Sequence, residues 1–242
     1  MLMSSAYAHI AYQLATVDTS GFPHVRTHAH RGFLFPKDAP HAPLLITSTD
    51  IRAPKVLEML STSNVEAVWW LEGSLEQFRV SGRALVVPAL KDHLHLVASA
   101  RIATWYEPGL KALRERGEEA EQSARKEDGM GTAFDFEKKR QEVFDAMPSF
   151  LKAEWARPVV PGEVVESVAA LEQWAIDIPR KDEIKTDEDR RRWEAALENF
   201  AMVLIEPTRI DWLQLGVQPN RRTVFVRADD TASGWAEKLV VT

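Results

Sequence analysis

Residues that favour β-strands occupy both ends of this chain, and residues that favour helices occupy its middle. Up to Pro88, short runs of β-branched and aromatic residues alternate with turn signals such as Asp18–Pro23. After Pro88 the hydrophobic period lengthens to that of a helix, and it returns to two from Phe200 onward. Strands from the two ends must therefore meet in one structure, and short turns between strands favour antiparallel pairing.

We predict a mainly β fold with α insertions (α+β), in which an antiparallel β-barrel is completed by the C-terminal strands. It forms a single domain over residues 1–242, with a largely helical, acidic insertion at about 89–198 and closing strands at about 200–242. The segment 111–132 is highly charged and poor in apolar residues, so we expect an exposed helix or a mobile loop there.

The pattern also predicts the individual elements. Pro54 suits the first turn of a short helix, and Thr186 with Asp189 forms a capping box. The expected strands are 12–18, 24–35, 44–47, 66–71, 77–87, 200–205, 209–215, 223–227 and 235–241. The expected helices are 54–60, 89–105, 136–144 and 188–197.

Composition excludes several classes of protein. The 242 residues include no cysteine, which excludes disulfides and thiolate chemistry, and the net charge of −6 argues against a nucleic-acid binder. No run reaches the roughly 20 apolar residues of a membrane span, and residues 1–5 do not resemble the start of a signal peptide. We expect a soluble, cytoplasmic protein without a membrane partner.

Four separate segments place cationic or amide side chains on or beside predicted strands, as an anionic, planar ligand would require. They are Arg26–Arg31, Ser48–Lys55, Gln77–Arg83 and Trp212–Arg222. The second combines hydroxyl, guanidinium and ammonium groups just before a helix, where unpaired N–H groups and the helix dipole favour phosphate. Solvent-facing charges at a turn are the alternative for that segment taken alone.

Strand alternation in 24–35 places His24, Arg26, His28 and His30 on one face and Thr27 with Arg31 on the other. Three histidines on one face could bind a metal, but no ligand from another strand is tied to this face by the sequence. We therefore predict no metal site, and interpret the face as polar and partly wetted.

The order of these motifs resembles the pyridoxamine 5′-phosphate oxidase-like family of FMN-binding split barrels, and within it the Alr4036-type branch. The similar stretches are Ala15–Asp18 with Gly21 and Pro23, Val25–Thr27, Leu45–Lys55, Trp69–Trp70, Glu76–Ala84, Asn199–Leu215 and Arg221–Arg222. Each motif is nonspecific alone, whereas the ordered set, covering about 120 residues, is fairly specific.

The resemblance implies a split barrel that binds FMN at a homodimer interface. Arg26, Thr27 and Arg31 would then lie beside the flavin, and Gln77 would face its ring. The residues that would contact the ribityl phosphate are Ser48, Thr49, Arg52 and Lys55. Trp212 and Arg222 would reach the flavin from the other subunit.

Two motifs depart from the vitamin B6 oxidases of that family. Gln218 and Asn220 stand where those enzymes carry an Arg-x-His pair for their substrate, and Ala53-Pro54-Lys55 stands where they carry Ser-Arg-Lys. A substrate other than pyridoxamine phosphate is therefore expected. Ser149, Trp155, Arg157 and Pro158–Gly162 resemble a segment near the flavin, but we assign them no role. Trp105, Trp155, Trp174 and Trp193 are expected to pack the insertion onto the barrel.

Function remains open among three hypotheses. The leading one is an FMN-dependent oxidoreductase with an unknown small-molecule substrate and no catalytic residue identified. The alternative is a non-catalytic carrier of flavin or of another anionic heterocycle, such as haem or a deazaflavin, and the third is a structural barrel with vestigial cationic sites. Homodimerisation is expected because a split barrel leaves a face uncovered, for which Trp69, Trp70 and Phe78 are candidates.

Overall fold

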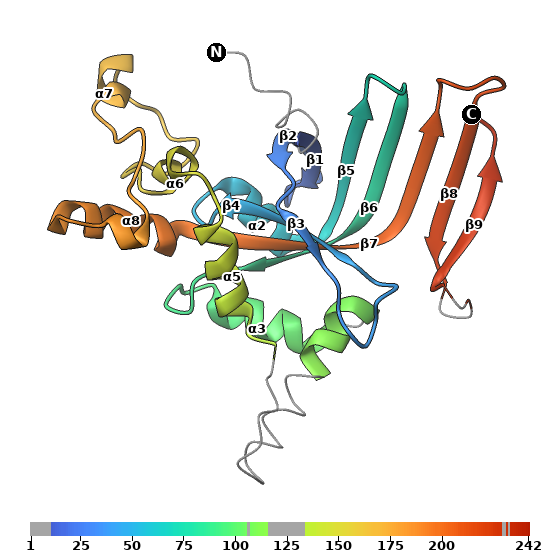
Figure 1. The fold of residues 1–242 in the computed structure, drawn as a ribbon, viewed down its shortest axis with the longest axis horizontal. Coiled ribbons are helices and arrows are strands. Elements are labelled where there is room, and N and C mark those ends of the chain that lie inside the picture. Colours follow the sequence, from blue (N-terminus) through green and yellow to red (C-terminus); the bar gives the residue numbers. More distant parts are fainter. Residues whose placement is uncertain (1–10, 106, 116–133, 229–230, 232) are drawn as a thin grey trace, which may run out of the picture.

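The computed structural model describes residues 11–105, 107–115, 134–228, 231 and 233–242. One antiparallel sheet curls into a half-barrel, with helices packed around it (Figure 1). Its strands are β1 (Ala11–Val17), β2 (Pro23–Ala29), β3 (Gly32–Leu34), β4 (Leu44–Asp50), β5 (Asn64–Leu71), β6 (Glu76–Val87), β7 (Phe200–Gln214), β8 (Arg221–Arg227) and β9 (Trp235–Val240). Its helices include α2 (Pro54–Ser61), α3 (His95–Thr104), α5 (Phe136–Asp145), α6 (Ser149–Trp155), α7 (Val168–Glu172) and α8 (Asp187–Asn199), with a 3₁₀ turn at Lys181–Glu183. The predicted fold class is confirmed.

The strand β7 joins the two ends of the sheet. From Met202 to Gln214 one edge of β7 pairs with β6, while its other edge pairs first with β4 and then with β8. The sequence pattern predicted two strands here, at 200–205 and 209–215, but the structure has one continuous strand. Glu206 and Pro207 do not interrupt it, because the pairing with β6 shifts register between Ser81 and Gly82 and continues beyond.

Two hydrophobic cores lie on opposite faces of β7 and its neighbours. Phe200, Met202 and Leu204 face the core that holds Trp105, Trp155 and Trp193. The intervening residues of β7 face the barrel interior, where Val56 and Met59 of α2 pack against them. The start of β7 is buried on both faces, which explains its unbroken apolar run. The expectation that tryptophans pack the insertion onto the barrel is confirmed for these three.

The barrel closes where the predicted strand 24–35 breaks into β2 and β3. β2 pairs with β1, whereas β3 pairs with β4 on the opposite side of the sheet. Between them Arg31 donates its backbone N–H to the Ile46 carbonyl at 2.8 Å, and Gly32 has a φ of 122° that glycine adopts readily. The chain therefore crosses the gap of the half-barrel at Arg31.

Most helix boundaries follow the predicted signals. α2 begins with Pro54, and Thr186 and Asp189 form the capping box of α8. α3 begins later than the predicted 89–105, because residues 89–94 form turns in which the Asp92 carboxylate accepts the Leu94 N–H at 2.7 Å. Residues 108–115 are helical, and the remainder of the charged segment, 116–132, lies outside the described residues.

A buried carboxylate ties that helical segment to β7. Glu206 accepts the backbone N–H groups of Gly109 and Leu110 at 2.6 and 3.0 Å, and its burial raises the pKa of its carboxyl. A Cβ at Gly109 would stand 2.6 Å from the Ala42 carbonyl oxygen, so this approach requires glycine. Glu206 thus caps the start of the helix at 108–115.

Arg140 of α5 is the largest fully buried side chain among the described residues, with a relative exposure of 1%. It forms an ion pair with Glu137 at 2.7 Å and donates to the carbonyls of Leu197 and Phe200 at 2.8 and 2.7 Å. The guanidinium therefore joins α5 to the end of α8 and the start of β7.

We expect Arg140→Met to lower the free energy of unfolding by about 2–4 kcal/mol, because two buried carbonyls and the Glu137 carboxylate lose their donor. Chemical denaturation measures the change. The control Lys139→Met, on the same helix, removes only an exposed pair with Glu142 and should cost less than about 1 kcal/mol. Equal stability of the two variants would contradict the role assigned to Arg140.

Candidate functional site

A cleft of about 430 Å³ runs between the barrel and the helical insertion. One wall is formed by β2, the end of β4 and the start of α2, and the other by the segment from α6 to Trp174. Its volume lies within the range of about 300–1,000 Å³ that is usual for small-molecule sites. Five of the predicted ligand residues line it, namely Thr27, Arg31, Ser48, Thr49 and Lys55.

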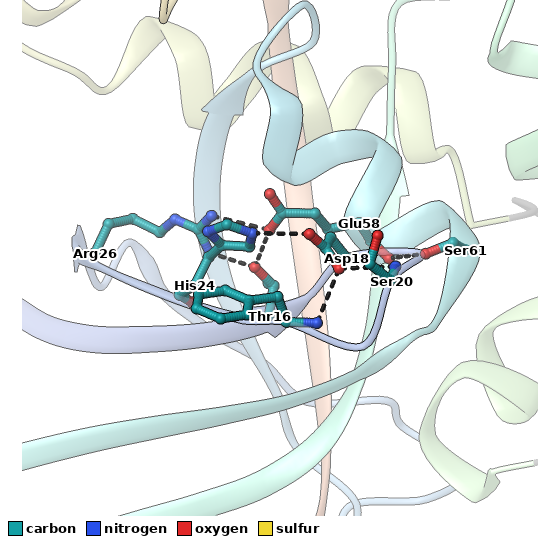
Figure 2. Close-up of polar contacts among 8 residues, drawn as sticks. Thr16, Asp18, Ser20, His24, Arg26, Glu58 and Ser61 are labelled. Atoms are coloured by element: carbon teal, nitrogen blue, oxygen red, sulfur yellow. Dashed lines mark hydrogen bonds and ion pairs between the residues drawn. The ribbon is translucent and has the colours of Figure 1, made fainter.

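Two further predicted residues, Arg26 and Arg52, lie beside the cleft and are held by carboxylates. Arg26 binds Glu58 of α2 at 2.9 Å, and both residues contact Thr16 (Figure 2). Arg52 donates hydrogen bonds from two nitrogens to the Asp50 carboxylate at 2.9 and 2.7 Å, and it donates a third to the Arg157 carbonyl. These guanidinium groups are therefore largely neutralised by intramolecular partners.

Figure 2 also shows how the hairpin between β1 and β2 supports this ion pair. Asp18 accepts the backbone N–H groups of Ser20 and Phe22 and contacts His24 at 3.2 Å. The hydrogen bond from Phe22, followed by that of His24, lowers the pKa of the Asp18 carboxyl. The turn is thereby fixed next to Arg26.

Lys55 differs from these arginines. Among the described residues, none forms a hydrogen bond or an ion pair with its ammonium. Burial, and after it the charge of Arg26, lower the pKa of Lys55, although Asp50 and Glu58 act in the opposite direction. A partly buried ammonium without a close counter-ion is electrostatically suited to receive an anion.

Hydroxyl groups and a second cation complete this end of the cleft. Arg31 donates to the Ser48 hydroxyl at 3.4 Å, and Thr49 is buried beside Lys55 in the cleft wall. His28, which the sequence placed on a polar, partly wetted face without a metal, also lines the cleft. Burial, then the charges of Lys55, Arg26 and Arg31, lower its pKa to about 3, so this imidazole is neutral near pH 7.

The remaining predicted residues, Gln77, Trp212 and Arg222, lie on the part of the sheet that extends beyond the barrel. β8 and β9 are at one end of the molecule, and α6, α7 and α8 are at the other (Figure 1). None of the three lines the cleft. Within one chain, the structure therefore does not bring them to Lys55.

The strand register separates these three residues further. Leu213 lies opposite both Gln77 and Arg222, so Gln77 and Arg222 share one face of the sheet. Trp212 is on the other face, where it stacks on Phe78 with ring centroids 5.7 Å apart and donates to Glu76 at 3.0 Å. The predicted group of three is therefore divided between two faces.

An ion-pair network dominates the face that carries Arg222. Asp211 accepts hydrogen bonds from Arg222, Arg79 and Arg209 at distances between 2.6 and 3.2 Å. The bond from Arg222, followed by the others, holds the pKa of the Asp211 carboxyl well below its ordinary range. This carboxylate fixes Arg222 in place.

The candidate dimer residues are also divided between the faces. Trp69 is opposite Phe78 and stacks on Tyr12 with ring centroids 4.3 Å apart, so its side chain packs within this chain. Trp70 points to the face of Gln77 and Arg222 and is 47% exposed. Of the three, Trp70 is the aromatic residue that the structure leaves uncovered.

The helical wall of the cleft was not assigned from the sequence. It consists of Leu151, Glu154, Trp155, Arg157, Val159–Glu163, Val165, Leu171 and Trp174. The Arg157 guanidinium lies 5.4 Å from the centre of the Trp174 ring, which therefore contributes to the cleft and not to a core. The likeness noted for Trp155, Arg157 and Pro158–Gly162 was the one signal that pointed to this wall.

Two features of the described residues limit the chemistry. No three or more His, Asp or Glu side chains among them gather as a metal site would require. Over the same part of the chain, every helix is too short or too polar to cross a bilayer. The cleft offers a cationic end lined by hydroxyl groups and an aromatic wall, an arrangement that fits an anionic ligand with a planar group.

Comparison with known proteins agrees with this arrangement. Residues 3–88 match the family model described as "Pyridoxamine 5'-phosphate oxidase, FMN-binding domain". The curated pyridoxine/pyridoxamine 5'-phosphate oxidase 2 of Arabidopsis thaliana is 34% identical over 87 residues, which are 36% of this chain and 41% of that protein. The match thus spans less than half the length of the plant relative.

Solved structures extend the likeness of the fold to nearly the whole chain. A pyridoxamine 5'-phosphate oxidase-related, FMN-binding protein from Nostoc punctiforme covers 99% of this chain and 91% of its own, with a TM-score of 0.59 and 22% identity. PhzG from Burkholderia lata, solved with tetrahydrophenazine-1-carboxylic acid, covers 96% and 82%, with a TM-score of 0.51 and 12% identity. These identities establish the fold alone.

The match over residues 3–88 includes β1 to β6 and the predicted ligand segments up to Gln77–Arg83, which form the cationic wall of the cleft and one strand pair of the extended sheet. By this match residues 3–88 are similar to the FMN-binding domain of the pyridoxamine 5'-phosphate oxidase family, and nearly the whole chain has the split-barrel fold.

Proposed function

We propose that this protein binds FMN in the cleft between barrel and insertion, with the phosphate at Lys55, Arg31, Ser48 and Thr49. The observation that carries the proposal is the Lys55 ammonium, which is partly buried in the cleft wall and has no close counter-ion among the described residues. A phosphate dianion would supply that counter-ion and would form charge-assisted hydrogen bonds with Lys55 and Arg31.

The partners of the other cations support the fit of the FMN phosphate to this site. Arg26 and Arg52 are engaged by Glu58 and Asp50, so they shape the site and leave Lys55 for the ligand. The Ser48 and Thr49 hydroxyls line the same wall, where they donate to Met147 Sδ at 4.0 Å and to the Asp50 carbonyl at 3.2 Å. Trp155 and Trp174 supply aromatic surface on the opposite wall. A phosphate with a flat ring system matches that division.

We further propose that the protein is an oxidoreductase, in which FMN supplies the electron-transfer chemistry and the chain positions it. The family match over residues 3–88 supports this proposal. Gln218 and Asn220 are exposed and uncharged where the vitamin B6 oxidases carry an Arg-x-His pair, which favours a substrate other than pyridoxamine phosphate. The motif order is the reason to place the chain in the Alr4036-type branch.

The flavin site is proposed to be shared between two copies of the chain. Gln77 and Arg222 lie on the extended sheet and cannot line the same cleft as Lys55 in one chain, so a second subunit would supply them. Trp70 on that same face is 47% exposed, and Val240 of β9 is 37% exposed. A partner packed on this face would cover both.

Lys55→Gln should weaken FMN binding about 10- to 100-fold, because the variant loses a charge-assisted contact with the phosphate. Quenching of flavin fluorescence on titration gives the dissociation constant. The matched control is Lys91→Gln, at an exposed lysine outside the cleft. Unchanged affinity in the Lys55 variant would remove this residue from the phosphate site.

A mixing experiment tests the shared site. Lys55→Gln and Arg222→Met each damage every site in a homodimer, but a mixed dimer would keep one site with both native residues. Refolding the two variants together in equal amounts should therefore restore strong binding in about a quarter of the sites.

Stoichiometric titration measures the recovered fraction, with each variant refolded alone as the control. If mixing restores no tight site although each variant alone binds weakly, Lys55 and Arg222 do not act across subunits. Oxidation of a nicotinamide or an amine by the flavin-loaded protein would distinguish the oxidoreductase from a carrier.

A further inference from the structure

His28 has an unusual environment for a histidine that lines a ligand cleft. It lies on β2 opposite Tyr12 of β1, faces the barrel interior and is only 6% exposed. Its Nε2 atom is buried and has no hydrogen-bond partner among the described residues. An unpaired acceptor of this kind costs about 1–3 kcal/mol in a folded protein, which invites an explanation.

The hydrogen bonds of Thr47 determine which ring nitrogen carries the proton. The Thr47 hydroxyl donates to the Ala29 carbonyl at 3.0 Å and has no second proton to give. It therefore accepts the contact from His28 Nδ1 at 3.2 Å, so Nδ1 bears the hydrogen. In the neutral ring, Nε2 is then a bare acceptor.

The charges around the ring keep it neutral. Burial and the cations Lys55, Arg26 and Arg31 lower the pKa of His28 to about 3, far below the range from pH 6 to 8.5. The carboxylates on the neighbouring elements, Asp50 of β4 and Glu58 of α2, are engaged by arginines.

Other titratable groups near the ring do not change this. Glu154 of α6 pairs with Arg157, and Glu163 lies on the far wall of the cleft. Burial raises the pKa of Tyr12 to about 12, so that phenol is also neutral. Tyr12 does not line the cleft, whereas His28 does.

We propose that His28 determines ligand specificity, with its Nε2 accepting a hydrogen bond from an O–H or N–H group that the ligand carries beside its phosphate. This inference rests on the proposed function of the cleft. Lys55 and Arg31 attract any anion, but a neutral acceptor beside them adds a requirement that an anion without an O–H or N–H group, such as sulfate, does not meet. A phosphate ester on a polyol chain, such as the ribityl phosphate of FMN, has hydroxyl donors next to the phosphate.

Two substitutions at this position test the inference. His28→Leu removes the acceptor at similar volume and should weaken FMN binding about tenfold. His28→Gln keeps an acceptor oxygen and should recover most of that loss. Sulfate, which carries no proton near neutral pH, should compete with FMN with the same inhibition constant in both variants and the native protein, because it cannot donate a hydrogen bond to Nε2.

Stability gives a readout that does not depend on binding. Removing an unpaired buried acceptor should leave the ligand-free His28→Leu protein at least as stable as the native protein in urea denaturation. A merely structural histidine would instead show lower stability together with an equal loss of FMN and sulfate affinity, and this result would overturn the proposal.

Two further results would overturn it. One is an FMN affinity unchanged in His28→Leu, and the other is a loss of FMN affinity between pH 6 and 8.5 that disappears in that variant, which would show a protonated donor in place of the neutral acceptor. If neither FMN nor sulfate binds the native protein, the proposed function fails as well. Tight FMN binding that ignores His28 removes the specificity role alone.

Discussion

The double burial of β7 is the constraint on which the rest of the structure depends. The first residues of this strand face the barrel interior on one side and the helical core on the other. The same strand then continues to pair with β8 in the extended part of the sheet. A single element therefore fixes the insertion, the barrel and the extension relative to one another, and the cleft lies where the first two meet.

Electrostatic pairing organises the cleft once this framework is in place. Carboxylates on β4 and α2 engage Arg52 and Arg26, and these pairs surround Lys55 without neutralising it at contact distance. Burying charge is costly unless partners are supplied, so paired arginines are stable parts of the wall, whereas an unpaired ammonium is a position prepared for an external anion. His28 adds a neutral acceptor to the same wall, which makes the cationic end chemically selective as well as attractive.

Much of the fold could be predicted from the sequence because its signals are local. Strand alternation, Pro54 at the start of α2 and the capping box of α8 each operate within a few residues. The cleft residues Arg31, Ser48, Thr49 and Lys55 were also found, because they lie on or next to those strands. Local patterns could not predict the partners of distant charges: nothing near Arg26 or Arg222 in the sequence specifies that a carboxylate on another strand or helix holds each of them. Likewise, the pairing register of β6 with β7 places Gln77 and Trp212 on different faces of the sheet. Long-range packing forms the cleft wall from α6 to Trp174.

The two walls of the cleft depend on different parts of the molecule. The barrel wall is built from strands whose alternation and pairing leave little freedom, while the opposite wall consists of short helices and connecting segments between α6 and Trp174. Substitutions in those connections can reshape the mouth and the aromatic lining without disturbing strand pairing or the ammonium end. In such a scaffold one wall binds the charged group that different ligands share, and the other wall distinguishes the rest of each ligand. New reactions can therefore arise from substitutions on one wall alone.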